Sequence, residues 1–423
     1  MQRSLALLLA AVLVSSAGCN VMGQPNVAIA RSDAPRATAD PAAATEAALA
    51  IDAFGFDLYR RLASGDPSAD LVFSPGSVAI ALAMARAGGR GETAAQMDAV
   101  MRALGSDASA AAINALDQAL AARSGTFKGQ DGKPYELTLR IANAPFAQRD
   151  EAWQQAFLDA LAARFGAGVR LVDYKADADG ARKQINAWVK QETEQRIPEL
   201  LAPGLLDAMT RLVLVNAIYL KAPWLTAFPP EASKDGTFTR LDGSTVTVPM
   251  MSLAESFPYA KGDGWRAVEL PYVGGSLSLD VIVPDDLAAF EKALDANAFA
   301  QVTSALASQS VELAMPRFAV ETKADLASLL GALGMPLAFD PERADFSGMT
   351  TQEPLSVSNV VHQANISVDE KGTEAAAATA VVMRATAAPA EPVRFSVDRP
   401  FLFALRDVPT GAILFLGRVL DPS

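Results

Sequence analysis

Few residues of this chain have the types and spacing that enzyme chemistry requires. His362 is the only histidine and Cys19 the only cysteine, so we predict no metal site, and no intramolecular disulfide is possible. The 423 residues contain no G-x-S-x-G elbow, no glycine-rich phosphate loop and no H-E-x-x-H motif. The acidic pair Asp285-Asp286 follows an apolar run at a proline, so we expect solvated loop side chains there.

A Ser/His/Asp triad would have to use His362 as its general base. That residue lies in the strand-like run V-S-N-V-V-H-Q-A-N-I-S-V. In such an apolar context we expect a buried histidine whose ring nitrogens are hydrogen-bonded. A hydrolase is therefore only a distant alternative, and we predict that the chain is not an enzyme and needs no cofactor.

One stretch, V-D-E-K-G-T-E-A-A-A-A-T-A-V-V from Val368 to Val382, has conflicting structural preferences. Its alanines favour a helix, whereas the threonine and valines that follow them favour a strand. Every second residue from Thr373 to Ala385 is uncharged, while Glu374 and Arg384 fall in the other phase. A strand would therefore carry its charges on one face only. Such conflicts are expected where function requires two conformations.

Composition and charge exclude several classes of partner. The chain is 51% hydrophobic and 20% charged, which is enough for a large core, and its formal net charge is −12. An acidic protein is electrostatically unsuited to nucleic acid, to heparin-like polyanions and to anionic membrane surfaces. We expect a monomer.

The N-terminus is typical of an export signal. Arg3 precedes the apolar run Leu5–Val14, which is too short to span a bilayer, and small residues then lead to Cys19. This pattern resembles a bacterial lipoprotein signal over residues 1–18, with Cys19 as the lipidated residue. An ordinary secretory signal is the alternative. Either way we predict export, to the cell envelope or the extracellular space, with residues 19–47 forming a flexible Ala/Pro-rich tether.

Helical patterns dominate the first half of the chain and strand patterns the second, which predicts one interleaved α+β domain over residues 48–423. In F-S-P-G-S-V, Ser74 and Pro75 have the chemistry of a helix start, and the apolar residues that follow predict a buried helix. Further predicted helices are 92–104, 107–122, 151–165, 181–194, 286–306 and 326–333, the last opened by a capping box over Thr322–Asp325. Predicted strands include 135–146, 212–222 and a C-terminal hairpin of 400–406 with 412–419.

Ten landmarks in order resemble the serpin family, over about Ala48–Pro422. They are F-S-P-G-S-V, A-L-A-M-A-R-A-G-G-R-G-E-T, I-N-A-W-V, L-V-L-V-N-A-I-Y-L-K-A-P-W-L-T-A-F, L-P-Y, M-P-R-F, L-G-M, A-D-F-S-G-M, the stretch V-D-E-K-G-T-E-A-A-A-A-T-A and the closing D-R-P-F-L-F with I-L-F-L-G-R-V. The resemblance implies a serpin fold, with eight to nine helices around three β-sheets and an exposed reactive-centre loop at about 370–392.

The resemblance also implies a suicide inhibitor of serine proteases. The target protease would cleave the loop and be trapped as an acyl-enzyme while the loop inserts into the central sheet. The uncharged phase of the hinge suits insertion, because burying an unpaired charge is costly. The alternative is a non-inhibitory serpin-fold binding protein that is cleaved as a simple substrate.

Residue roles follow from the same resemblance. The hinge comprises Glu370, Gly372, Thr373, Glu374, Ala375, Ala376, Ala377, Ala378 and Thr379. A polar cluster beneath the sheet, the shutter, comprises Ser74, Ser77, Asn216 and His362, and we expect Asn216 to hydrogen-bond His362. The entry point of the loop, the breach, comprises Trp224, Arg317 and Glu370, the last two as a charge pair.

Two positions for the scissile bond remain open. Counting from Glu370 as family members commonly allow favours Thr386-Ala387, with small neighbours that suit elastase-like or subtilisin-like proteases. Arg384-Ala385 is the alternative, and it would select trypsin-like proteases, whose pocket binds a cation.

Overall fold

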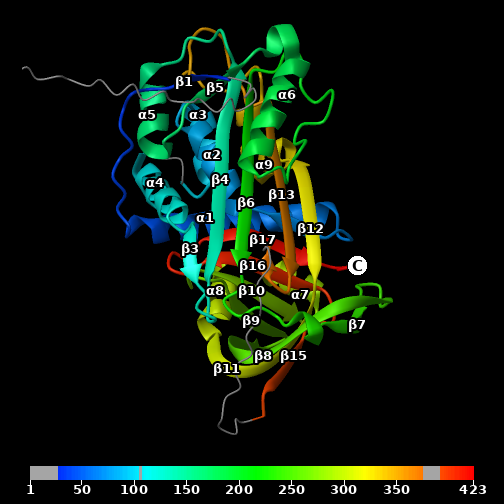
Figure 1. Cartoon of the computed structure of the whole chain (residues 1–423). Helices are drawn as coiled ribbons and strands as arrows, with labels where there is room; N and C mark the ends of the chain where they lie inside the picture. Colours follow the sequence, from blue (N-terminus) through cyan, green and yellow to red (C-terminus); the bar gives the residue numbers. More distant parts are fainter. Residues whose placement is uncertain (1–26, 104–106, 375–390) are drawn as a thin grey trace, which may run out of the picture.

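Two β-sheets, set one above the other in Figure 1, organise the computed structural model. The structure describes residues 27–103, 107–374 and 391–423. Cys19, the predicted signal 1–18 and both candidate scissile bonds lie outside the described residues. None of the helices in the described ranges is both long and apolar enough to cross a membrane.

The first sheet has eight strands in the order β1-β5-β4-β6-β14-β13-β12, with β3 paired to β4. Its central strands β4, β6 and β13 are long, and β6 is buried along nearly its whole length, which agrees with its almost unbroken apolar sequence. The strands are β1 (Ala28–Ala30), β3 (Gly125–Lys128), β4 (Pro134–Gln148), β5 (Val169–Val172), β6 (Leu212–Pro223), β12 (Phe318–Asp325), β13 (Asn359–Asp369) and β14 (Gly372–Thr373).

The second sheet has nine strands in the order β15-β11-β8-β9-β10-β16-β17-β2, with β7 paired to β8. The 18-residue strand β8 pairs in turn with β7, β11 and β9, so it joins the second and third expected sheets into one hydrogen-bonded unit. The predicted C-terminal hairpin is confirmed as β16 and β17. The strands are β2 (Leu71–Phe73), β7 (Lys234–Thr239), β8 (Thr245–Gly262), β9 (Trp265–Pro271), β10 (Leu277–Pro284), β11 (Ala307–Pro316), β15 (Val393–Ser396), β16 (Phe401–Asp407) and β17 (Ile413–Val419).

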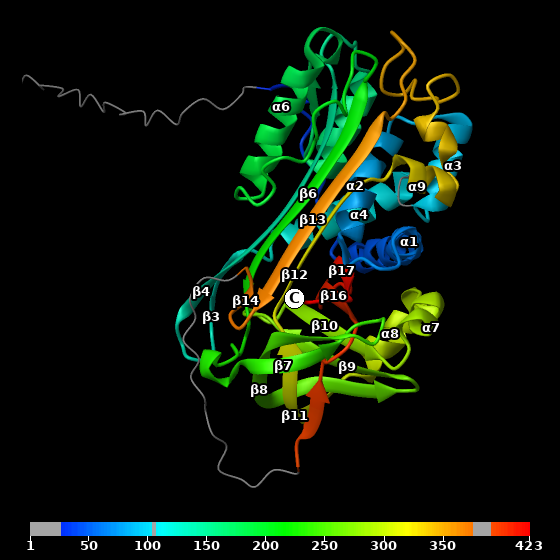
Figure 2. The same ribbon diagram turned by 90° about the vertical axis from the view of Figure 1, so that its right-hand side faces the viewer.

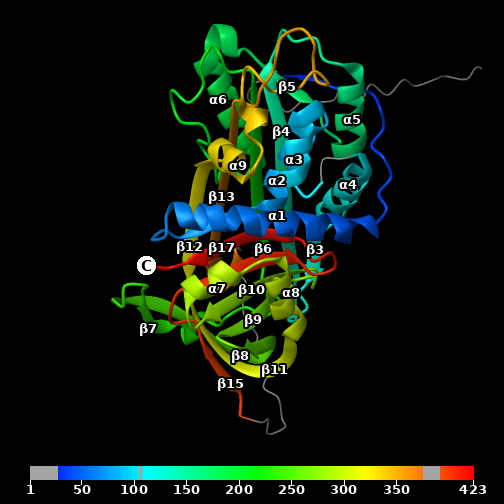
Figure 3. The same cartoon turned by 180° about the vertical axis from the view of Figure 1, so that it is seen from behind.

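Helices cover both faces of the first sheet. Figure 2 shows α6 on one side of β6 and β13 and α2 on the other, and Figure 3, the view from behind, shows α1 crossing in front of the strands. Ser74 caps α2 by accepting a hydrogen bond from the Ser77 N–H, and residues 75–85 are all buried, as predicted. The described residues contain nine α-helices: α1 (Ala43–Gly65), α2 (Pro75–Arg86), α3 (Gly91–Val100), α4 (Asp107–Ala121), α5 (Gln155–Phe165), α6 (Tyr174–Glu192), α7 (Leu287–Ala293), α8 (Ala296–Ala305) and α9 (Ala327–Leu333).

The expected tether 19–47 is wrong for its described part, because residues 27–47 belong to the fold. We call residues 27–42 the strap. Its strand β1 pairs antiparallel with β5 at the edge of the first sheet. Beyond it, Ser32 Oγ donates to Asp159 Oδ1 at 2.5 Å and the Ala37 N–H donates to the Ala163 carbonyl at 2.8 Å. The pairing of β1 and the bond from Ala37 use backbone groups, so the Ala/Pro-rich composition of the strap gives no sign that it docks on the domain.

Two helix boundaries also differ from the prediction. The expected helix 286–306 is broken at Leu294, because Asp295 starts a second helix by accepting from the Ala298 N–H at 2.8 Å. The expected capping box is wrong, because Thr322 and Asp325 belong to β12. There, Thr322 Oγ1 accepts from the Val72 N–H at 2.9 Å and so ties β12 to β2.

The close approach of the strap to Gly168 gives a first testable prediction. A Cβ at Gly168 would lie 2.6 Å from the Ala30 carbonyl oxygen, whereas a Cβ at Gly65 would meet nothing within 4 Å. We expect Gly168→Ala to displace the strap, at a cost of about 1–3 kcal/mol to its docking, and Gly65→Ala to have no such effect. Hydrogen exchange should report faster exchange for β1 amides in the first variant only. Unchanged protection would contradict the docking described here.

Candidate functional site

The hinge already occupies a place in the first sheet. Strand β14, Gly372–Thr373, pairs antiparallel with both β6 and β13, and Figure 2 shows it between their lower ends. Farther along, β6 and β13 pair directly and in parallel, Asn359–Gln363 against Val213–Ala217. The sheet is thus parted at one end by the hinge and closed at the other.

Specific contacts hold the two inserted residues. Thr373 is 1% exposed, and its hydroxyl shares a 2.6 Å hydrogen bond with the Tyr272 hydroxyl. Gly372 has φ +147°, and a Cβ there would lie 2.1 Å from the Ala222 carbonyl oxygen. Only glycine fits this approach without displacing β6.

Glu374 follows β14 with a φ of +51°, outside strand geometry, and its side chain lies toward Arg196. Its carboxylate forms an ion pair with Arg196, with 3.1 Å between Oε2 and Nε, and its side chain is only 6% exposed. Burial raises the pKa of Glu374, and the Arg196 charge opposes that shift. Arg196 lies just after α6, so this ion pair ties the hinge to the chain that leaves that helix.

The three predicted breach residues meet where β14 begins. Arg317 donates to Glu370 from Nε at 2.7 Å and also from Nη2, and Ser233 Oγ donates to the same carboxylate at 2.5 Å. Trp224 Nε1 donates to the Asp369 carbonyl at 2.9 Å. Burial alone would raise the pKa of Glu370, but the hydrogen bonds from Arg317 and Ser233 lower it overall, so the carboxylate stays charged.

The four predicted shutter residues lie together between α2, β6 and β13. His362 Nδ1 hydrogen-bonds Asn216 Oδ1, which is the contact expected from the sequence, and the Ser74 N–H donates to His362 Nε2 at 3.1 Å. Ser77 Oγ donates to Asn143 Oδ1 at 3.0 Å. The cluster thus spans the two central strands and the helix beneath them.

The hydrogen bonds assign the histidine tautomer. Because Nε2 accepts from a backbone N–H, the proton lies on Nδ1 and is donated to Asn216. Full burial lowers the pKa of His362 to about 3, so the ring is neutral at physiological pH. Among the described residues, Asn216 Nδ2 finds no acceptor, so the cluster retains one unused donor.

Three contributing residues escaped the sequence analysis. Asn143 interrupts the apolar run of β4 as Asn216 interrupts β6, and that pattern could have identified it. Tyr272 stacks on Trp224, with ring centroids 4.5 Å apart and an interplanar angle of 11°, and it stands in the L-P-Y landmark. Arg196 carries no signal in the sequence, because only the fold brings it to Glu374.

No described side chains resemble a metal or catalytic centre. The described residues hold no group of three or more His, Cys, Asp or Glu that could bind a metal ion. His362 contacts Asn216 and a backbone N–H, without an acidic orienter or an exposed nucleophile.

The family model described as "Serpin (serine protease inhibitor)" matches residues 49–422. The chain belongs to the serpin family. It is 39% identical to the leukocyte elastase inhibitor of Equus caballus over 381 residues, covering 87% of this chain and 97% of the relative. It is 36% identical to plasminogen activator inhibitor 1 of Sus scrofa, covering 89% and 92%.

A solved serpin agrees with the fold. The thermophilic serpin tengpin in its native state has a TM-score of 0.80 against this chain. The two are 26% identical, and the match covers 93% of this chain and all of tengpin. The α+β serpin fold predicted from the landmarks is thus confirmed. The relatives are named as inhibitors, in agreement with the prediction that this serpin is not an enzyme.

The shifted pKa of His362 predicts a pH dependence of stability. In the unfolded chain the histidine binds a proton below about pH 6.5, whereas in the folded serpin it stays neutral to about pH 3. The unfolded state therefore binds more protons in this window, and stability should fall with falling pH by up to about 1.4 kcal/mol per unit. We expect the free energy of unfolding, measured with denaturant at several pH values, to fall more steeply with falling pH in the wild type than in His362→Gln. An equal dependence of the free energy of unfolding on pH in the two proteins would contradict a buried, neutral His362.

Proposed function

We propose that this serpin inhibits serine proteases by suicide cleavage of its loop. The protease serine would attack a loop carbonyl, the peptide bond would break with release of the new amine terminus, and an ester would join the two proteins. Insertion of the freed loop between β6 and β13 would then distort the protease before water hydrolyses the ester. The observation that carries this proposal is β14, whose two residues already pair with both strands.

The register of β14 supports further insertion. Gly372 and Thr373 pair with Pro223 and Ala222 on one side and with Asp369 and Val368 on the other. If both antiparallel registers continue, Thr379 arrives opposite Asn216 and His362 at once. Those two residues are direct neighbours in the parallel pairing, so insertion would replace their contact, and the Thr379 hydroxyl would meet the unused Asn216 donor.

The alternation of the hinge supports the same proposal. Thr373 faces the larger core and Glu374 faces the α6 side, so the uncharged phase from Ala375 to Ala385 would face that core, while the other phase would pass beneath α6. No charge would then have to enter the core. A non-inhibitory serpin needs no such face, which is why we rank that function second.

Loop composition supports a preference among targets. We favour cleavage at Thr386-Ala387 by an elastase-like or subtilisin-like protease, with Arg384-Ala385 and a trypsin-like protease as the alternative. The horse relative is named an elastase inhibitor, which agrees with the first choice. We further propose a monomer that is exported from a bacterium and lipidated at Cys19, after removal of residues 1–18.

Matched charges on the two faces of the hinge test the mechanism. We expect Thr379→Arg to be cleaved without forming an SDS-resistant adduct, because the cation would enter the core between Asn216 and His362. Ala376→Arg, in the other phase, would lie opposite the half-buried Asn365 if the register continues, and it should still form the adduct. Denaturing gels after reaction with elastase, subtilisin and trypsin measure both. If neither the wild type nor Ala376→Arg forms an adduct with any of them while all are cleaved, the chain is a substrate and not an inhibitor of these enzymes.

The scissile bond can be read directly. We expect the small C-terminal fragment released from the denatured adduct to begin at Ala387, and mass spectrometry will give its mass. A fragment that begins at Ala385 would instead assign the trypsin-like specificity. In that case Arg384→Ala should abolish adduct formation with trypsin.

Lipidation predicts a change of compartment. We expect the wild type, expressed in a bacterium, to partition with membranes and to incorporate labelled palmitate. Cys19→Ser should be soluble after export and should carry no label. Equal partitioning of the two proteins, without label in either, would leave an ordinary secretory signal as the explanation.

A further inference from the structure

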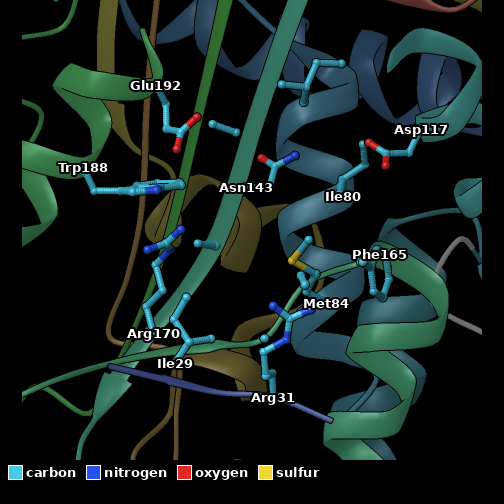
Figure 4. Close-up of a pocket in the computed structure, with 16 residues that line it drawn as sticks. Ile29, Arg31, Ile80, Met84, Asp117, Asn143, Phe165, Arg170, Trp188 and Glu192 are labelled. Atoms are coloured by element: carbon cyan, nitrogen blue, oxygen red, sulfur yellow. The ribbon is translucent and has the colours of Figure 1, made fainter. Parts of the chain in front are cut away.

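A pocket of about 300 Å³ lies at the side of the first sheet, and one of its lining residues is Asn143, the partner of Ser77 in the shutter. Figure 4 shows it between α2, which contributes Ile80 and Met84, and the guanidinium groups of Arg170 and Arg31. Its size is at the small end of the range for ligand sites, roughly 300–1,000 Å³. The strap supplies one wall through Ile29 and Arg31.

Arg170 is a half-buried cation without a carboxylate partner. Within the described residues it forms no ion pair, and its guanidinium carbon instead lies 4.7 Å from the Trp188 ring centroid and 5.9 Å from that of Phe146. Burial lowers the pKa of Arg170, and the more distant Glu192 charge opposes that shift. The rings stabilise the charge, but they leave the planar N–H fork, which suits a carboxylate, without an anion.

The charges of the pocket are separated along its length. Arg170 and Arg31 lie at one end in Figure 4, and Glu192 and Asp117 lie at the other. Asp117 is already neutralised by an ion pair with Arg36 of the strap, whereas Arg31 forms no ion pair within the described ranges. The cationic end is therefore open to an anion, while Glu192 disfavours a second negative charge at the far end.

The wall between these two ends carries apolar side chains and one polar side chain, Asn143. Ile80 and Met84 from α2 are 2% and 4% exposed, and Phe165 from the end of α5 is also buried. Apolar lining with a few convergent polar groups is typical of sites for small organic ligands. We propose that this pocket binds a monocarboxylate with an apolar body, whose carboxylate pairs with Arg170 and Arg31.

The strap completes this site. Ile29 is the middle residue of β1 and pairs with Arg170 of β5, Arg31 follows β1 directly, and Gly168 gives their backbone the space to approach. A docked strap is therefore required for a closed pocket. Displacing it by Gly168→Ala should weaken the ligand's affinity, although Gly168 itself carries no side chain.

Calorimetric titration of the purified serpin with octanoate tests the proposal. We expect one saturable site, and at least tenfold weaker binding of 1-octanol, because the neutral head cannot pair with a guanidinium. Octylammonium should not bind. No octanoate binding at millimolar concentrations, equal binding of octanol, or preferential binding of octylammonium would each overturn the proposal.

Substitutions locate the ligand. Arg170→Met should lower octanoate affinity at least tenfold, and Arg170→Lys, which keeps the charge but loses the planar fork, should lower it less. Arg266→Met is the matched control, since Arg266 also lies over an aromatic ring, 5.2 Å from the Phe395 centroid, but on the second sheet.

If Arg170→Met does not fold, Arg31→Gln at the rim should still reduce affinity several-fold. Unchanged affinity in Arg31→Gln and in every folded Arg170 variant would contradict the assignment. Adduct formation with proteases is not part of this readout.

Discussion

The incomplete pairing of β6 with β13 is the constraint on which this structure depends. Two long neighbouring strands would normally bond along their whole length, because each unpaired buried backbone group costs free energy. Here direct pairing ends at Ala217 and Gln363, and two hinge residues supply the bonds at the far end. The sheet therefore has room between β6 and β13 for one more strand, which the loop after the hinge could supply. Insertion of that loop would satisfy backbone groups that the native arrangement leaves poorly paired.

The contacts at the two ends of this opening have different physical character. Charged and polar groups, centred on Glu370 and Arg317, fix the point where the chain turns into the sheet. A neutral network with one unused donor, centred on His362 and Asn216, lies where the strands still touch. A neutral, partly satisfied cluster is easier to reopen than a charge pair held by several hydrogen bonds, which suits strands that must separate while the entry point stays fixed.

The sequence predicted most of this arrangement, because its signals were local or came from ordered landmarks. The capped helix α2, the polar residue inside β6 and the alternation of the hinge were all readable from spacing. The docking of the strap was not readable from the sequence, because the three residues of β1, Ala28–Ala30, pair with β5 through backbone groups that every sequence has. Arg196 and the two-helix form of 286–306 depended on tertiary contacts and on a single aspartate cap, which periodicity does not report.

The docked strap has a geometric consequence for a lipid-anchored molecule. If Cys19 carries the lipid, only the seven residues Asn20–Asn26 separate the anchor from the folded chain, a span of at most ~25 Å. Strand β1 lies at one end of the molecule and β15, where the chain returns after the loop, lies at the other (Figures 1 and 3). Such an anchor would hold the β1 end of the molecule toward the bilayer and leave the β15 end, which adjoins the proposed cleavage loop in the sequence, facing away from it.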